Sequence, residues 1–92
     1  MNASLVLKCT KSMAQKLLLR TDLDDAARIR DAYERALARP PAAQDIDRAL
    51  TFIARVEKAA ESHETDPAAR HLFAWQSFCK ALIASNEFIY LN

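Results

Sequence analysis

The chain contains no glycine, and this absence restricts the folds that it can form. Glycine supplies the positive φ angles of tight hairpin turns and the close backbone approach of phosphate-binding loops. The sequence therefore excludes a dinucleotide-binding or P-loop motif and disfavours a β-sandwich. Eighteen alanines favour closely packed helices instead. We expect an all-α fold.

Size and charge narrow the expectation further. The 92 residues suffice for one domain, and 51% apolar with 27% charged residues is ordinary globular composition. A net charge of +1 provides no long-range field to attract nucleic acid or an acidic membrane. The first residues have neither the apolar core of a signal peptide nor the length of a membrane span. We expect one helical domain over residues 1–92, with no nucleic-acid partner and no membrane insertion.

Periodicity and helix-ending residues predict a compact four-helix domain. The helices are expected at residues 4–20, 23–38, 43–60 and 67–85. Thr21 and Asp22 should end the first helix and cap the second, and Pro40 and Pro41 should stop the second. Asp66 resembles an N-cap before a proline at the first helical position, after a polar loop at 61–66.

Each predicted helix has an apolar stripe that should face a common core. The stripes comprise Val6, Cys9, Met13 and Leu17; Ala26, Ile29, Tyr33 and Leu37; Ile46, Ala49, Leu50, Ile53 and Val56 or Ala60; and Leu72, Trp75, Cys79, Leu82 and Ile83. Three phenylalanines flank these stripes and widen the predicted buried faces: Phe52, Phe73 and Phe78. Asp31 and Arg35 should form an i,i+4 ion pair on the outer side of the second helix.

A short apolar tail is expected after the fourth helix. Asn86 is the residue best suited to end that helix, because asparagine can adopt the left-handed backbone conformation that turns the chain away. Phe88 and Tyr90 would then anchor the tail on the helices or in a neighbouring molecule, which makes the chain a monomer or a weak homodimer. Glu87 would accept hydrogen bonds from backbone amides or pair with an arginine.

The two cysteines leave three alternatives open. Cys9 and Cys79 both lie on predicted apolar stripes, so two free thiols in the core is the plainest interpretation. If the two stripes face each other, a disulfide would join the first and last helices. A reactive thiol is the third alternative, although no neighbouring sequence feature lowers the pKa of either group.

The first predicted helix carries Lys8, Lys11, Lys16 and Arg20, and no acid precedes Asp22. A solvated face explains this modest basic surface, and a site for an anionic partner or nucleic acid is the alternative.

The sequence contains no complete catalytic or metal-binding motif. His63 and Glu64 begin like a HExxH zinc motif, but Pro67 occupies the position of the second histidine. No spacing supports a nucleophile with its base. We therefore expect a chain that is not an enzyme and that needs neither a metal nor another cofactor.

Two segments resemble a known family. Residues 26–41, AARIRDAYERALARPP, and residues 75–90, WQSFCKALIASNEFIY, are together similar to the C-terminal region of the planctomycete domain of unknown function fifteen-fifty-three. The positions of interest in these segments are Tyr33, Leu37, Arg39, Pro40, Pro41, Trp75, Asn86, Glu87, Phe88 and Tyr90. Arg39 could donate hydrogen bonds to carbonyls at a helix end.

The resemblance implies that the chain is a C-terminal fragment of a larger exported protein, periplasmic or at the cell surface. Many members carry a cytochrome c-type domain, but the haem motif is absent here. The family pattern has glycine where this chain has Ala38, and alanine there favours continuing the helix. We expect a structural or protein-interaction module that contacts other domains of its parent or a separate protein. The alternative is an accessory domain of an exported enzyme or electron-transfer protein that helps to bind substrate or partner.

Overall fold

A computed structural model confirms the all-α four-helix domain, with 82% of residues helical. It describes the backbone of residues 3–91 and the side chains of residues 8–85. Four α-helices and one short 3₁₀ helix follow one another along the chain: α1 (Ala3–Leu19), α2 (Asp25–Leu37), α3 (Ala43–Ala59), η1 (Ala60–Ser62) and α4 (Pro67–Leu91).

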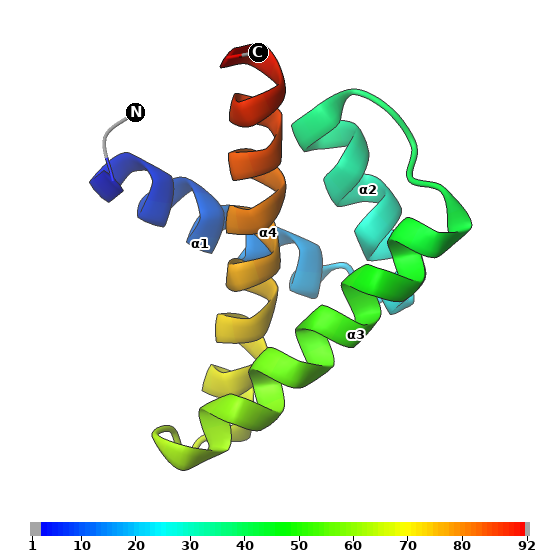
Figure 1. The fold of residues 1–92 in the computed structure, drawn as a ribbon. Helices are drawn as coiled ribbons and strands as arrows, with labels where there is room; N and C mark the ends of the chain where they lie inside the picture. Colours follow the sequence, from blue (N-terminus) through cyan, green and yellow to red (C-terminus); the bar gives the residue numbers. More distant parts are fainter. Residues whose placement is uncertain (1–2, 92) are drawn as a thin grey trace.

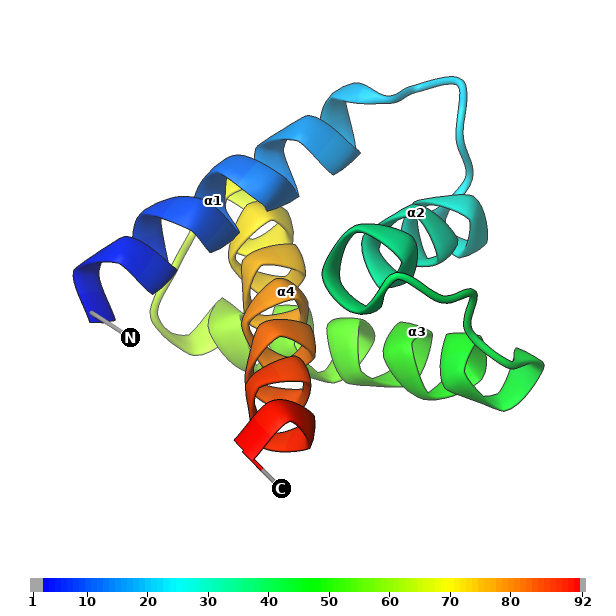
Figure 2. The same ribbon diagram turned by 90° about the horizontal axis from the view of Figure 1, so that it is seen from above.

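Helix α4 is the central element, and each of the other three α-helices packs against it (Figure 1). Helices α1 and α3 pass on opposite sides of α4, while α2 lies between them (Figure 2). This arrangement agrees with the sequence, because the fourth predicted helix has the broadest apolar face.

Trp75 lies in the core and is fully buried. It is surrounded by an apolar cluster drawn from all four α-helices, whose larger members are Leu17, Ile29, Ile53, Phe78, Cys79 and Leu82. The predicted stripes of the last three helices therefore face the core as expected. Phe52 and Phe73 remain 39% and 45% exposed, so they do not widen the buried face in the way that Phe78 does.

Among the described positions of the stripe predicted for the first helix, one is wrong, and Val6 lies outside the described side chains. Thr10, Ala14 and Leu17 are buried, whereas Cys9 is exposed. Met13 and Leu17 of the predicted stripe still pack against the core, and the small side chain of Ala14 lets α1 approach α4 closely.

The start of α2 differs from the prediction by two residues. Asp24, rather than Asp22, is the N-cap, and its Oδ1 accepts a hydrogen bond of 2.8 Å from the amide of Ala27. Asp22 instead receives two hydrogen bonds from the guanidinium of Arg20. Either aspartate could serve as an N-cap by its chemistry. Asp24 is the cap because its backbone has the extended conformation that an N-cap residue adopts.

The end of α4 also differs from the prediction. Asn86 does not turn the chain, since the helix continues through it to Leu91. No proline or glycine follows Asn86, and an asparagine alone is a weak helix terminator. The roles predicted for Glu87, Phe88 and Tyr90 concern side chains that lie outside the described residues. At the other end of α4, the predicted cap is confirmed, because the Asp66 carboxylate accepts a hydrogen bond of 3.1 Å from the amide of Ala68.

Ala38 ends α2 in the left-handed conformation, with φ 56° and ψ 30°. Its amide donates a hydrogen bond of 3.0 Å to the carbonyl of Glu34, which is the bond of an αL helix ending. The expectation that alanine would prolong the helix is therefore wrong. Pro40 and Pro41 follow after Arg39 and prevent a helical continuation, so Ala38 adopts a conformation that usually belongs to glycine.

Replacing Ala38 by glycine should stabilise the protein by about 1 kcal/mol, because glycine adopts the left-handed region without a steric penalty from Cβ. Ala36→Gly, two residues earlier and inside the helix, is the comparison. There glycine should cost at least about 1 kcal/mol, because it lowers helix propensity and removes a methyl group that packs against the core. Urea denaturation followed by circular dichroism measures both changes. A loss of stability in Ala38→Gly would contradict this account of the helix ending.

Candidate functional site: a basic groove between helices α1 and α2

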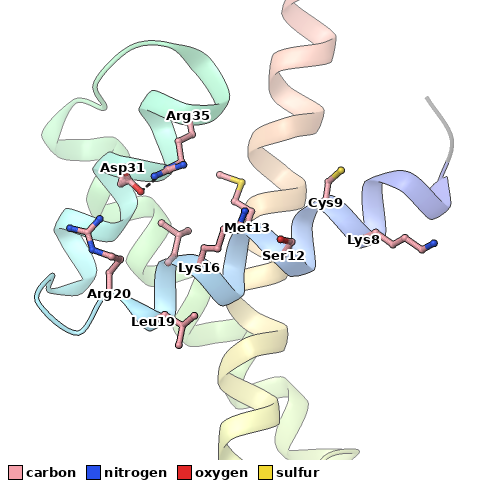
Figure 3. Close-up of a pocket in the computed structure, with 10 residues that line it drawn as sticks. Lys8, Cys9, Ser12, Met13, Lys16, Leu19, Arg20, Asp31 and Arg35 are labelled. Atoms are coloured by element: carbon pink, nitrogen blue, oxygen red, sulfur yellow. Dashed lines mark hydrogen bonds and ion pairs between the residues drawn. The ribbon is translucent and has the colours of Figure 1, made fainter.

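A groove of about 620 Å³ lies between α1 and α2 (Figure 3). Helix α1 supplies most of its lining, and α2 supplies two charged residues on the opposite side. The lining consists of Lys8, Cys9, Ser12, Met13, Lys16, Leu17, Leu19, Arg20, Asp31 and Arg35.

The groove is open because of how α1 is oriented. Thr10 and Ala14 are buried, so the residues on the opposite side of α1 face outward. Lys8 and Lys16 are both exposed on this outer side. Figure 3 shows Lys16 and Met13 projecting to the side on which Arg35 of α2 lies.

Apolar side chains form part of the lining. Leu17 is buried, Met13 is partly buried, and Leu19 is 78% exposed. An exposed leucine alone is ordinary, but here it borders a hollow that also contains a methionine. Methionine is flexible and polarisable, and it is common on surfaces that accommodate protein partners.

The charge of the groove is predominantly positive. Four basic residues line it against one acid, Asp31, which the guanidinium of Arg35 contacts at 2.9 Å as predicted. Arg20 is paired with Asp22 at 2.8 Å, an exposed contact that raises the pKa of Arg20 and lowers the pKa of Asp22. Within the described part of the chain, Lys8 and Lys16 have no ion-pair partner.

The two cysteines lie in different environments. Cys9 is an exposed free thiol in the groove, and Cys79 is a free thiol buried in the core. The disulfide considered from the sequence is therefore not formed, and only Cys79 behaves as a core residue. The physical reason is the orientation of α1, which turns Cys9 toward solvent while Thr10 takes the buried position.

Burial in apolar surroundings raises the pKa of the Cys79 thiol to about 12 from its ordinary value of 9.0. Between these two values, the unfolded chain loses the thiol proton while the native protein retains it. Stability should therefore fall as the pH rises through this window, with a slope approaching about 1.4 kcal/mol per pH unit.

Urea denaturation at pH 8 and at pH 10.5 measures this loss, and Cys79→Ala supplies the comparison. The variant lacks the titrating thiol, so its stability should fall less over the same interval. Equal losses in both proteins would show that Cys79 does not retain its proton.

The histidines do not form a metal site. Nδ1 of His71 lies 2.6 Å from Oε1 of Glu57, a contact that joins α4 to α3, and His63 packs edge-on against Phe73. Among the described residues, no group of three potential ligands is close enough to hold a metal ion.

Asp31 and Arg35 of the family-like segment 26–41 line the groove, whereas Tyr33, Leu37 and Arg39 lie outside it. Tyr33 contacts Phe78, and the guanidinium of Arg39 lies 6.0 Å from the centre of the Tyr33 ring. This placement corrects the prediction for Arg39, which makes a cation–π contact rather than bonding carbonyls at a helix end. Leu37 packs against the core.

Arg28 performs the role predicted for Arg39, and the sequence analysis missed it. Its Nε donates to the carbonyl of Leu17 at 3.0 Å, and its Nη2 donates to the carbonyl of Arg20 at 3.1 Å. A third bond, from Nη1 to Asp25, holds the guanidinium in place. The available signal was an arginine one turn into a helix that follows a short connection, from which its side chain reaches back to the preceding helix end.

No family model matches the chain, and no curated protein or solved structure shows significant similarity to it. The resemblance to the planctomycete family stays a prediction. None of the described helices has the length and apolar character needed to cross a membrane.

Proposed function

We propose that this chain is a non-catalytic helical module that binds a protein partner, and that an acidic segment of the partner occupies the α1–α2 groove. One observation carries the proposal: unpaired lysines border an open, partly apolar groove. Opposite charge in the partner would speed association and orient the partner, while the apolar lining would contribute contact energy.

The distribution of charge along the chain supports an acidic partner. Residues 3–20 contain four of the 13 Lys and Arg residues and none of the 12 Asp and Glu residues. The rest of the chain is therefore net acidic, and the small overall charge conceals a basic helix. A protein partner is favoured over nucleic acid because the cations are few and lie beside apolar side chains rather than along an extended basic track.

Reversing the charge of Lys16 should weaken binding of an acidic helical peptide by about tenfold, because one rim contact is lost and a repulsion is added. Fluorescence anisotropy with a labelled peptide measures the affinity. Lys58→Glu is the matched control, since this lysine is exposed on α3 outside the groove and its reversal changes the net charge equally.

The expected pattern is weaker binding in Lys16→Glu, unchanged binding in Lys58→Glu, and a lower affinity as salt screens the charges. Equal effects of the two reversals would contradict the groove as the site. Tighter binding of DNA, RNA or anionic vesicles than of the acidic peptide would contradict a protein partner.

If the family resemblance holds, the partner is another domain of the same exported protein or a protein in its compartment. This assignment rests on the sequence likeness of residues 26–41 and 75–90. Sequencing the complete reading frame would test it, because an upstream domain of the resembled family is expected.

A further inference from the structure

We infer that the segment bound in the groove is an amphipathic α-helix of about three turns whose acidic residues flank its apolar stripe on both sides. This inference rests on the proposed function and specifies the partner's chemistry. It follows from the placement of the basic residues, the length of the groove and the absence of a pairing strand among the described residues.

The basic residues stand on two rims with apolar side chains between them. Lys16 belongs to the α1 rim, and Arg35 belongs to the α2 rim (Figure 3). Lys8 lines the end of the groove farther along α1, where Figure 3 shows its side chain pointing away from α2. Met13 and Leu17 lie in the groove between these rims. A complementary ligand therefore presents apolar side chains at its centre and negative charge at both edges.

The two rims differ in strength. Lys8 and Lys16 have no ion-pair partner among the described residues, whereas Arg35 already contacts Asp31. The side chain of Arg35 is nevertheless 61% exposed, so a second carboxylate has access to it. We expect the α1 rim to contribute more to affinity than the α2 rim.

The length of the lining sets the length of the ligand. The groove follows α1 from Lys8 to Arg20, which corresponds to ~18 Å along the helix axis. A helix of about 12 residues spans this distance in three turns.

The secondary structure of the lining favours a helical ligand. Every element that borders the groove is a helix, so no strand edge is present there to pair with an extended peptide. A helical ligand satisfies its own backbone hydrogen bonds and needs only side-chain contacts.

Two stapled peptides of identical composition test the inference. In the first, glutamates flank a leucine stripe on both sides, and in the second the same glutamates lie on the face opposite the stripe. The staple is required because unconstrained peptides of this length are barely helical in water. Anisotropy titrations with the full chain should give at least about tenfold tighter binding for the flanking arrangement. Lys16→Glu should remove this preference, and Lys58→Glu should retain it.

The outcomes separate this inference from the proposed function. If both peptides bind equally and Lys16→Glu weakens both, the groove binds acidic segments but the flanking arrangement is wrong. If neither peptide binds, the proposed function also fails. If light scattering of the chain alone shows self-association that Lys16→Glu abolishes, the occupant is a second copy, and the inferred partner is overturned.

Discussion

Replacing Trp75 by alanine should destabilise the protein by about 4 kcal/mol, because the change empties the centre of the core. Trp75 is fully buried, and its ring packs edge-on against Phe78 at a centroid distance of 5.9 Å. A second edge contact, at 6.4 Å, joins it to His71. Thermal and urea denaturation followed by circular dichroism measure the loss, since the variant has no tryptophan for a fluorescence signal.

Trp75→Phe separates the apolar contribution of the ring from that of its polar atom. The indole Nε1 is buried and has no hydrogen-bond partner among the described residues. An unsatisfied buried donor costs roughly 1–3 kcal/mol, so its removal should offset part of the volume that phenylalanine leaves empty. We expect Trp75→Phe to lose less than half as much stability as Trp75→Ala. Equal losses would indicate that Nε1 makes a stabilising hydrogen bond.

Replacing Arg28 by alanine should cost about 2 kcal/mol, because charged hydrogen bonds to the end of α1 are lost. Only 14% of the Arg28 side chain is exposed, so water replaces these bonds incompletely. The carbonyls of Leu17 and Arg20 also accept backbone hydrogen bonds. The loss of stability is therefore smaller than it would be if these carbonyls were left without any hydrogen bond. Urea denaturation followed by Trp75 fluorescence measures the change.

Two further variants show whether the geometry of the Arg28 guanidinium is responsible. Lysine retains the charge but cannot donate to both carbonyls from one planar group, so Arg28→Lys should recover less than half of the loss. Arg30→Ala is the matched control, since Arg30 is exposed on the same helix, and its loss should stay within about 0.5 kcal/mol. Similar losses in Arg28→Ala and Arg30→Ala would contradict the assigned role.

The helices could be predicted from the sequence because periodicity and prolines are local signals. The boundary at Pro40 and Pro41 and the start of α4 at Pro67 follow from the chemistry of proline alone. The choice between Asp22 and Asp24 as the cap of α2 depends on backbone geometry that neither residue determines by itself.

Tertiary packing decided the features that the sequence left open. Whether Cys9 or Thr10 faces the core depends on how closely α1 approaches α4, and a single helix does not contain that information. The left-handed Ala38 arises because the chain must turn before two prolines.

The groove could be predicted only in part. The basic face of α1 is visible in the sequence as Lys8, Lys11, Lys16 and Arg20, and an anionic partner was one of its two interpretations. The opposite rim could not be predicted, because it depends on the placement of α2 beside α1. Arg28 contributes to that placement by bonding the end of α1, which links the stability of the fold to the shape of the groove.

The most direct test of the proposed site is an amide chemical-shift map of the ¹⁵N-labelled protein, titrated with the stapled acidic peptide. Binding in the groove should shift the amides of residues 8–20 and 31–35 in proportion to occupancy. The amides of residues 47–58 in α3, which do not line the groove, should stay unchanged. Shifts confined to α3, or no shift at saturating peptide, would contradict the groove between α1 and α2 as the partner-binding site.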